Sequence, residues 1–208
     1  ARGQAMTQRD AHWNAVYETK DPSKVSWYQP RPDTSLRAIA LTGAENQPLI
    51  DVGGGASDLA KVLLERGWKD LTVLDISEAA HAVAAERLGR QSTQVTRIVA
   101  NITDWTPPRR YAVWHDRAVF HFLIDAADRA AYVAALNAGV ESGGYAILAT
   151  FAPDGPDKCS GLPVRRYSCE QLAIEMGPGF ELRHHWQKMH KTPGGAEQSF
   201  TWAVFQRL

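Results

Sequence analysis

The chain has 208 residues, of which 44% are hydrophobic and 22% are charged, and these proportions exclude an intrinsically disordered protein. Its 23 basic residues balance 23 acidic residues, so no net charge attracts nucleic acid or an anionic membrane. Two cysteines are too few for a disulfide framework, and no apolar run reaches the roughly 20 residues that span a bilayer, which favours a cytoplasmic protein. We expect one domain over residues 6–208, with residues 6–47 as a helical cover and residues 1–5 as a cloning remnant.

Two helices are predicted ahead of the first strand. Thr7 and Asp10 match a weak capping box, which starts a helix with aromatic residues on one face. A second helix follows Pro32 and ends at Gly43, because proline suits the start of a helix and glycine suits its end. An aromatic loop joins the two helices.

From residue 48 onward, short apolar runs alternate with helical patterns, which predicts right-handed crossovers in a parallel sheet. Helices are expected to begin at the N-cap residues Ser77 and Ser168, and an alanine-rich helix covers Ala126–Ala138. Two long segments flank Pro193–Gly195 and predict a C-terminal β-hairpin. The predicted strands before it are Leu49–Val52, Leu71–Leu74, Val95–Val99, Tyr111–Trp114 and Tyr145–Phe151.

A glycine-rich turn follows the first predicted strand, and an acidic residue ends the second. Gly53 and Gly55 lack Cβ atoms, so the backbone after Asp51 can turn sharply and approach a ligand closely. Asp75 stands where a carboxylate can accept hydrogen bonds from both hydroxyls of a ribose. The alternatives are a tight turn without a ligand and an acidic helix cap. A nicotinamide cofactor would suit the same features, but its motif needs Gly or Ala where this chain has Asp58.

With these residues placed, the chain resembles the class I S-adenosylmethionine-dependent methyltransferases. The resemblance implies S-adenosylmethionine as cofactor and a Rossmann-like α/β fold, in which a seven-stranded mixed sheet has helices on both faces and a C-terminal antiparallel β-hairpin. Asn101 departs from the acidic residue common at its position, yet its side-chain oxygen can still accept a hydrogen bond from the adenine amino group. The expected cofactor-binding residues, including the aromatic residues ahead of the first strand, are Trp13, Tyr17, Trp27, Asp51, Gly53, Gly55, Asp75, Ile76, Asn101 and Ile102.

Two narrower resemblances compete. His12-Trp13 and the loop Val25–Tyr28 look like the N-terminal cover of the thiopurine methyltransferase group, and Trp114–Ala118 looks like its Trp-Asp-Arg-Gly segment with one inserted residue. The N-terminal aromatic segment and the strand that follows Gly194-Gly195 are also similar to lysine methyltransferases that act on elongation factor.

Polar side chains cluster after the fourth predicted strand. His115 and His121 can serve as a base because imidazole titrates near neutral pH, and the alternative is a histidine that only forms structural hydrogen bonds. Arg117 can orient an anionic substrate or hold the carboxylate of the cofactor, and the alternative is a buried pair with Asp116. We expect these four residues to be the catalytic candidates.

The loop Pro153–Tyr167 is long enough to act as a lid over a pocket, which favours a small-molecule substrate over a protein lysine. Cys159 and Cys169 match no metal-binding spacing, so no metal is expected. The sequence therefore predicts methyl transfer from S-adenosylmethionine to a small molecule. Protein lysine N-methylation is the second interpretation, and a nicotinamide-dependent oxidoreductase is the alternative from a different class.

Overall fold

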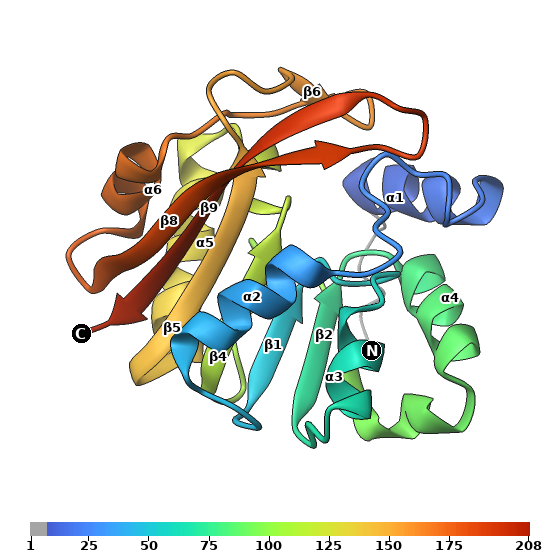
Figure 1. The fold of residues 1–208 in the computed structure, drawn as a ribbon, viewed down its shortest axis with the longest axis horizontal. Coiled ribbons are helices and arrows are strands. Elements are labelled where there is room, and N and C mark those ends of the chain that lie inside the picture. The colour runs from blue at the N-terminus through green and yellow to red at the C-terminus, as the bar shows by residue number, and fades with distance from the viewer. Residues whose placement is uncertain (1–7) are drawn as a thin grey trace.

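The computed structural model describes residues 8–208. They form a seven-stranded sheet with the strand order β3-β2-β1-β4-β5-β9-β8, and helices pack on its two faces (Figure 1). The expectations for the cloning remnant and for the cap at Thr7 fall outside these residues. The strands are β1 (Leu49–Val52), β2 (Leu71–Asp75), β3 (Val95–Val99), β4 (Tyr111–Arg117), β5 (Val140–Phe151), β8 (Phe180–Lys191) and β9 (Glu197–Arg207). The helices are α1 (Gln8–Thr19), α2 (Asp33–Thr42), α3 (Leu59–Glu65), α4 (Glu78–Leu88), α5 (Ala126–Gly139), α6 (Cys169–Met176) and the short 3₁₀ helices η1 (Gly89–Gln94) and η2 (Phe120–Phe122).

The sheet is mixed, as expected. Strands β1 to β5 pair in parallel, whereas β9 pairs antiparallel with both β5 and β8. The predicted C-terminal hairpin is confirmed, and β9 lies between β5 and the edge strand β8. The loop after β5 contains a feature that the sequence did not predict, a small hairpin of β6 (Lys158–Cys159) and β7 (Leu162–Pro163).

Alternating side chains bury both faces of the sheet. Along β5, Ile147 and Ala149 join a core with α2 and α3, whereas Ala146 and Leu148 join a second core with α5 and α6. Figure 1 shows α2 in front of the sheet and α5 behind it. Because both faces are covered, the central strands read as continuous apolar runs, which is typical of parallel sheets. This is why the sequence located them well.

The predicted caps of three helices are also present in the structure. Gly43 ends α2 in the left-handed conformation with a φ of 67°, which glycine adopts without strain. The Ser77 side chain accepts a hydrogen bond from the backbone N–H of Ala80 at the start of α4. Ser168 and Gln171 form the complete capping box of α6. Each signal depends on residues a few positions apart, so the local sequence suffices to predict it.

One strand boundary was wrong in a way that matters for the site. The sequence predicted that β4 ends at Trp114, but the strand continues to Arg117, which pairs with Ala149 of β5. Residues 115–117 therefore lie within a strand rather than in a loop. Because side chains alternate along a strand, neighbours in this segment point to opposite faces of the sheet.

Candidate active site

A cavity of about 820 Å³, counted out to its open mouth, lies at the carboxyl ends of the central strands. Ligands of open parallel sheets bind at this edge. Its wall combines residues from the ends of β1, β2 and β4 with residues of α1 and of the β6–β7 hairpin. The lining residues are Arg9, Trp13, Tyr17, Trp27, Val52, Gly53, Leu74, Asp75, Ile76, Ala100, Asn101, Ile102, Arg117, Ala118, Val119, Phe122, Leu123 and Cys159.

The glycine turn after β1 is fitted closely around the Asp75 carboxylate. The backbone N–H of Gly55 donates to Asp75 Oδ2 at 3.0 Å, and that of Ser77 donates to Oδ1 at 2.8 Å. A Cβ atom on Gly55 would lie 2.6 Å from Asp75 Oδ2, so the turn requires glycine there. Gly53 has a φ of 72°, which also favours glycine. Each carboxylate oxygen keeps a lone pair for a ligand in the cavity.

Burial raises the pKa of Asp75 to about 6, against the opposing effect of its hydrogen bonds with Ser77 and Gly55. Asp75 as a whole residue is only 7% exposed. It is therefore ionised at neutral pH at a cost in desolvation free energy. A donor pair from a ligand would offset that cost.

The residues that follow β2 and β3 form the apolar part of the cavity. Ile76, Asn101 and Ile102, which the sequence analysis expects to bind the cofactor, all line it. The structure corrects one detail, because Asn101 Oδ1 already accepts hydrogen bonds from the N–H of Thr103 at 3.1 Å and from its hydroxyl at 2.9 Å. Both lone pairs of this oxygen are used, so the amide NH₂ is the group of Asn101 that can bind a ligand.

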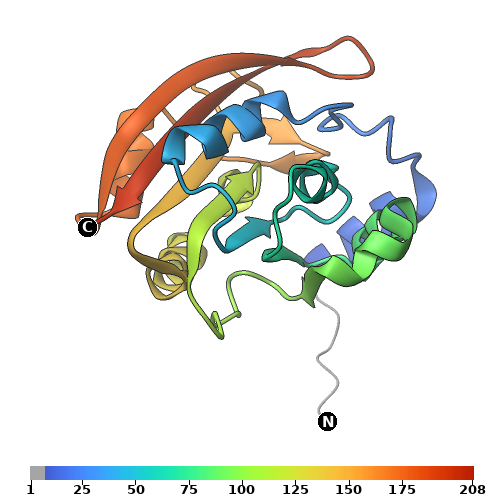
Figure 2. The same ribbon diagram turned by 60° about the horizontal axis from the view of Figure 1, so that its bottom comes forward.

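Three aromatic residues form a cover over the cavity, and we call Trp13, Tyr17 and Trp27 the aromatic cover. The rings of Trp13 and Trp27 meet edge to face with centroids 5.5 Å apart, and Phe122 contacts Trp13 at 5.4 Å. Trp27 Nε1 donates to the Tyr17 hydroxyl at 3.2 Å. The helix α1 that carries two of these rings packs against α4, beside which it lies in both Figure 1 and Figure 2.

Arg117 is hydrogen-bonded to the backbone of the aromatic cover. Its Nη1 donates to the carbonyl oxygen of Trp27 at 2.9 Å, and its guanidinium lies 5.0 Å from the ring centroid of Phe200. Its Nε and Nη2 atoms are buried and have no hydrogen-bond partner among the described residues. Burial lowers the pKa of Arg117 to about 10, so it remains a cation at neutral pH.

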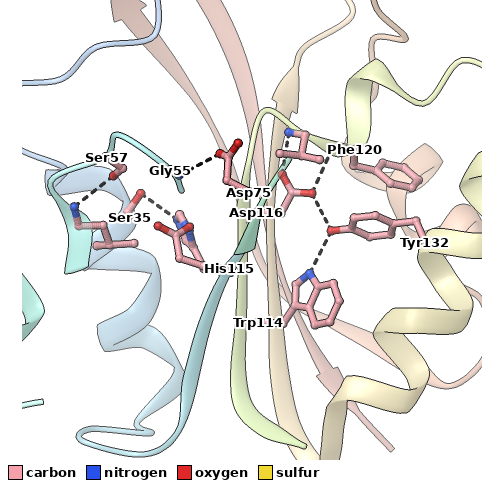
Figure 3. A network of polar contacts seen from close by, with 12 residues as sticks. Ser35, Gly55, Ser57, Asp75, Trp114, His115, Asp116, Phe120 and Tyr132 are labelled. Atoms are coloured by element: carbon pink, nitrogen blue, oxygen red, sulfur yellow. Dashed lines mark hydrogen bonds and ion pairs between the residues drawn. The ribbon is translucent and has the colours of Figure 1, made fainter. Parts of the chain in front are cut away.

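His115 belongs to a buried chain on the same face of the sheet as Arg117. The parallel register of β1 and β4 sets Asp51 opposite His115, and His115 Nδ1 donates to Asp51 Oδ1 at 2.7 Å. The other ring nitrogen pairs with the Ser35 hydroxyl of α2 at 2.9 Å (Figure 3). The sequence analysis missed Ser35, although a serine beside Leu36 on the apolar face of a helix was a usable signal.

Asp116 points to the other face, as Figure 3 shows, where its carboxylate is fully buried. It accepts hydrogen bonds from the Tyr132 hydroxyl at 2.6 Å and from the N–H groups of Val119 and Phe120. Burial raises its pKa to about 6. Asp116 does not line the cavity, and its contacts fix the turn between β4 and η2 that carries Val119. The four polar residues predicted as one cluster are thus divided between the two faces.

His121 is also fully buried and does not line the cavity. Its Nδ1 accepts a hydrogen bond from the backbone N–H of Phe151 at 3.1 Å, so the ring proton is on Nε2, which has no described partner. Burial, together with the smaller effect of the charge of Arg117, lowers the pKa of His121 to about 3. The carbonyl of His121 also accepts from the N–H of Arg165, which ties the loop after β5 to η2.

Cys159 lines the cavity, and the sequence analysis did not select it as a site residue. Burial raises its pKa to about 12, so the thiol is protonated at neutral pH. Within residues 8–208, no three His, Cys, Asp or Glu side chains are grouped to hold a metal ion. None of the helices in that range is both long and apolar enough to cross a membrane.

Residues 49–144, which include β1 to β4 and the glycine turn, match the family of methyltransferase domains. No curated protein sequence matches this chain at a significant level.

Solved structures share the fold of this chain. A SAM-dependent methyltransferase from Anabaena variabilis has a TM-score of 0.75 and 17% identity, covering 96% of this chain and 93% of its own. The 1,6-didemethyltoxoflavin-N1-methyltransferase of Burkholderia thailandensis, solved with S-adenosylhomocysteine, has a TM-score of 0.70 and 17% identity over 100% of this chain and 92% of its own. A structure from work on the conversion of a disulfide bond into a thioacetal group during echinomycin biosynthesis has a TM-score of 0.74 and 20% identity. The match covers 95% of this chain and 92% of its own.

The described residues of the cavity fit S-adenosylmethionine. Asp75 offers two acceptor oxygens beside a turn that a Cβ atom on Gly55 would obstruct. The apolar side chains after β2 and β3 suit adenine, and the aromatic cover suits a sulfonium through cation–π attraction. The two unpartnered nitrogens of Arg117 suit a carboxylate. The narrower resemblances to the thiopurine and lysine methyltransferases are not decided by these matches.

Proposed function

We propose that this methyltransferase transfers the methyl group of S-adenosylmethionine to a small-molecule acceptor. The observation that carries the proposal is that Asp75 at the end of β2, Trp13 of α1 and Cys159 of the β6–β7 hairpin line one cavity. The N-terminal helix α1 and the β6–β7 hairpin therefore border the same open-mouthed cavity. A concave pocket of this kind suits a small acceptor.

In this proposal Asp75 accepts hydrogen bonds from the ribose hydroxyls, and Ile76 and Ile102 pack against adenine. Asn101 donates from its amide NH₂ to a ring nitrogen. The cofactor supplies an activated methyl group on its sulfonium, so the chain mainly has to align the acceptor and exclude water. The aromatic cover, with its edge-to-face contacts, performs the second task.

The predicted catalytic residues then divide into one residue at the site and three that position it. Arg117 lies on the cavity wall, whereas His115, Asp116 and His121 hold neighbouring segments through buried hydrogen bonds. With His121 held neutral and the Cys159 thiol protonated, neither is suited to remove a proton near pH 7. We therefore infer that neither of these two residues is the base and that the acceptor loses its proton to solvent before methyl transfer.

The positive charges on the cavity wall disfavour protein lysine methylation. That activity remains the second interpretation because of the narrower resemblance to elongation-factor methyltransferases. Arg9 and Arg117 line the cavity, and a lysine ammonium would have to approach both beside a cationic sulfonium. The resemblance of Trp114–Ala118 to the thiopurine group agrees with a small acceptor. The structures of similar fold named above also include a 1,6-didemethyltoxoflavin-N1-methyltransferase solved with 1,6-didemethyltoxoflavin bound.

An acceptor screen with radiolabelled cofactor tests the proposal. We expect label transfer to one class among thiols, phenols and heteroaromatic N–H compounds, and no transfer to proteins of a cell lysate. Asp75→Ala serves as the control, because it should abolish transfer by weakening cofactor binding. Label in protein bands alone would overturn the small-molecule assignment, and failure to bind S-adenosylhomocysteine would overturn the methyltransferase activity itself.

A further inference from the structure

Trp27, a member of the aromatic cover, lies in a tight turn between α1 and α2. The backbone N–H of Tyr28 donates to the carbonyl oxygen of Val25 at 3.0 Å, which closes a β-turn. Ser26 and Trp27 are its two central residues, and Trp27 lies on the cavity wall. Because Trp27 contacts both other members of the aromatic cover, its direction decides where the whole cover lies.

Two side chains from distant strands hold the peptide groups on either side of Trp27. His190 on β8 donates from Nε2 to the carbonyl oxygen of Ser26 at 2.8 Å, and Arg117 on β4 donates from Nη1 to that of Trp27 at 2.9 Å. The carbonyl of Ser26 shares a planar peptide group with the N–H of Trp27, and the carbonyl of Trp27 belongs to the next group. Since φ and ψ of Trp27 set the angle between these two planes, the two hydrogen bonds together fix the direction of its side chain.

His190 reaches the turn because the C-terminal hairpin extends beyond the strand next to it. The pairing of β5 with β9 ends at Phe200, whereas β8 stays paired with β9 as far as Glu197. In both Figure 1 and Figure 2 the end of the hairpin lies beside the chain that follows α1. His190 lies in this extension, so the length of the hairpin brings its imidazole to Ser26.

The hydrogen bond from His190 is shielded from water, because His190 is only 9% exposed and Ser26 is half-buried. A carbonyl oxygen can only accept, so the ring proton of His190 is on Nε2. Burial lowers the pKa of His190 below its ordinary value, although the bond to Ser26 opposes this effect. The ring is therefore uncharged at neutral pH, and its one N–H lies in the bond to Ser26.

We propose that His190 is a positioning residue for methyl transfer, which holds Trp27 over the cavity through the carbonyl of Ser26. The C-terminal hairpin is then part of the site, although no residue of β8 or β9, both described in full, lines the cavity. His190 touches neither the cofactor nor the acceptor in this assignment. The inference rests on the proposed function, since Trp27 matters for the reaction only if the cofactor lies under the aromatic cover.

Hydrogen exchange of the Trp27 indole N–H, followed by NMR on the full chain, tests the positioning without a ligand. The resonance is identified by its absence from the spectrum of Trp27→Phe. In His190→Leu this N–H should exchange about threefold faster or more, because the released turn lets the ring leave Tyr17 more often. An unchanged exchange rate overturns the inference and leaves the proposed function standing. His190→Asn, whose shorter amide does not reach Ser26, repeats the test if His190→Leu does not fold.

Two further variants separate the hydrogen bond from a general effect on β8. His190→Gln keeps an amide donor near the place of Nε2 and should restore part of the protection, which a purely structural role would not produce. His184→Leu is the matched control, since His184 lies on the same strand, is exposed and pairs with Val204 of β9. It should leave the exchange rate unchanged. Exchange in His190→Gln as fast as in His190→Leu, or an equal increase in His184→Leu, overturns the inference.

A double-mutant cycle links the positioning to cofactor binding. In calorimetry, His190→Leu should weaken S-adenosylhomocysteine binding by about threefold to tenfold, and Trp27→Ala by at least as much. In the Trp27→Ala background, His190→Leu should change the affinity by less than about twofold, because its effect passes through Trp27. Trp27→Leu repeats the cycle if Trp27→Ala does not fold.

The outcomes of the cycle distinguish the inference from the proposed function. Losses that multiply as independent effects, or an unchanged affinity in His190→Leu, overturn the positioning role of His190. If the natural chain does not bind S-adenosylhomocysteine, the proposed function is overturned, and with it the role of His190 in methyl transfer.

Discussion

The pKa of Asp75 leads to a direct prediction about cofactor binding. Burial raises that pKa to about 6, and ribose hydroxyls need the ionised carboxylate as acceptor on both oxygens. At pH 5 only about one carboxylate in ten is ionised, whereas at pH 7.5 nearly all are. S-adenosylhomocysteine should therefore bind about tenfold more weakly at pH 5 than at pH 7.5.

Protonation of Asp75 also changes the stability of the free protein. Because the folded-state pKa of Asp75 lies above its ordinary value of 3.8, the group stabilises the free protein as the pH falls through 6 towards 4. This stabilisation is lost as the pH rises through 6. Weaker binding in acid is therefore not explained by an Asp75-linked loss of the fold, and a thermal melt of the free protein at both pH values checks this.

Isothermal calorimetry from pH 5 to 7.5 is the assay, and Asp75→Asn is the control. Asn cannot titrate, and its amide NH₂ would oppose a backbone N–H of Gly55 or Ser77, so its affinity should be lower but independent of pH. Repeating the series with 5′-methylthioadenosine, which has the same adenosine and thioether without the amino-acid end, removes the titration of that end. Equal pH dependence in the two proteins, or a flat profile for the natural chain, would refute the reasoning.

Three further predictions follow from buried contacts. Gly55→Ala should weaken S-adenosylhomocysteine binding by about tenfold or more in calorimetry, since its Cβ would lie 2.6 Å from Asp75 Oδ2, and unchanged affinity would contradict the fitted turn. Tyr132→Phe should lower the free energy of unfolding in urea by about 1–3 kcal/mol, because Asp116 loses a buried donor, and a neutral result would count against that contact. His121→Asn should leave the pH dependence of kcat unchanged between pH 5 and 8, because the His121 pKa is about 3, and a shifted profile would restore His121 as the base.

Much of the fold could be predicted because it depends on local signals. The bounds of β1 and β3 agree with the structure. The short run of β1 is buried throughout and stands out from its neighbours, whereas the partly exposed edge strand β3 is marked by its β-branched residues. The caps at Ser77 and Ser168 agree as well, because a side chain that bonds to the backbone three residues later needs no distant partner. The glycine turn was visible for a similar reason, since only glycine permits its conformation.

The division of the polar segment after β4 needed the tertiary structure. Whether the strand stops at Trp114 or continues to Arg117 depends on pairing with β5, a segment about 30 residues away in the chain. That pairing sends His115 towards α2 and Asp116 towards α5, so adjacent residues belong to different networks.

The sequence by itself determined the order of the elements, the glycine turn and the residue types available at each strand end. The tertiary structure decided which of these groups are accessible and which are already bonded. Asn101 loses its acceptor oxygen to Thr103, His121 loses its accessibility, and Arg117 on the cavity wall keeps two nitrogens without a described partner. Burial and pairing determine the charge and reach of a side chain, and both arise only when distant segments pack together.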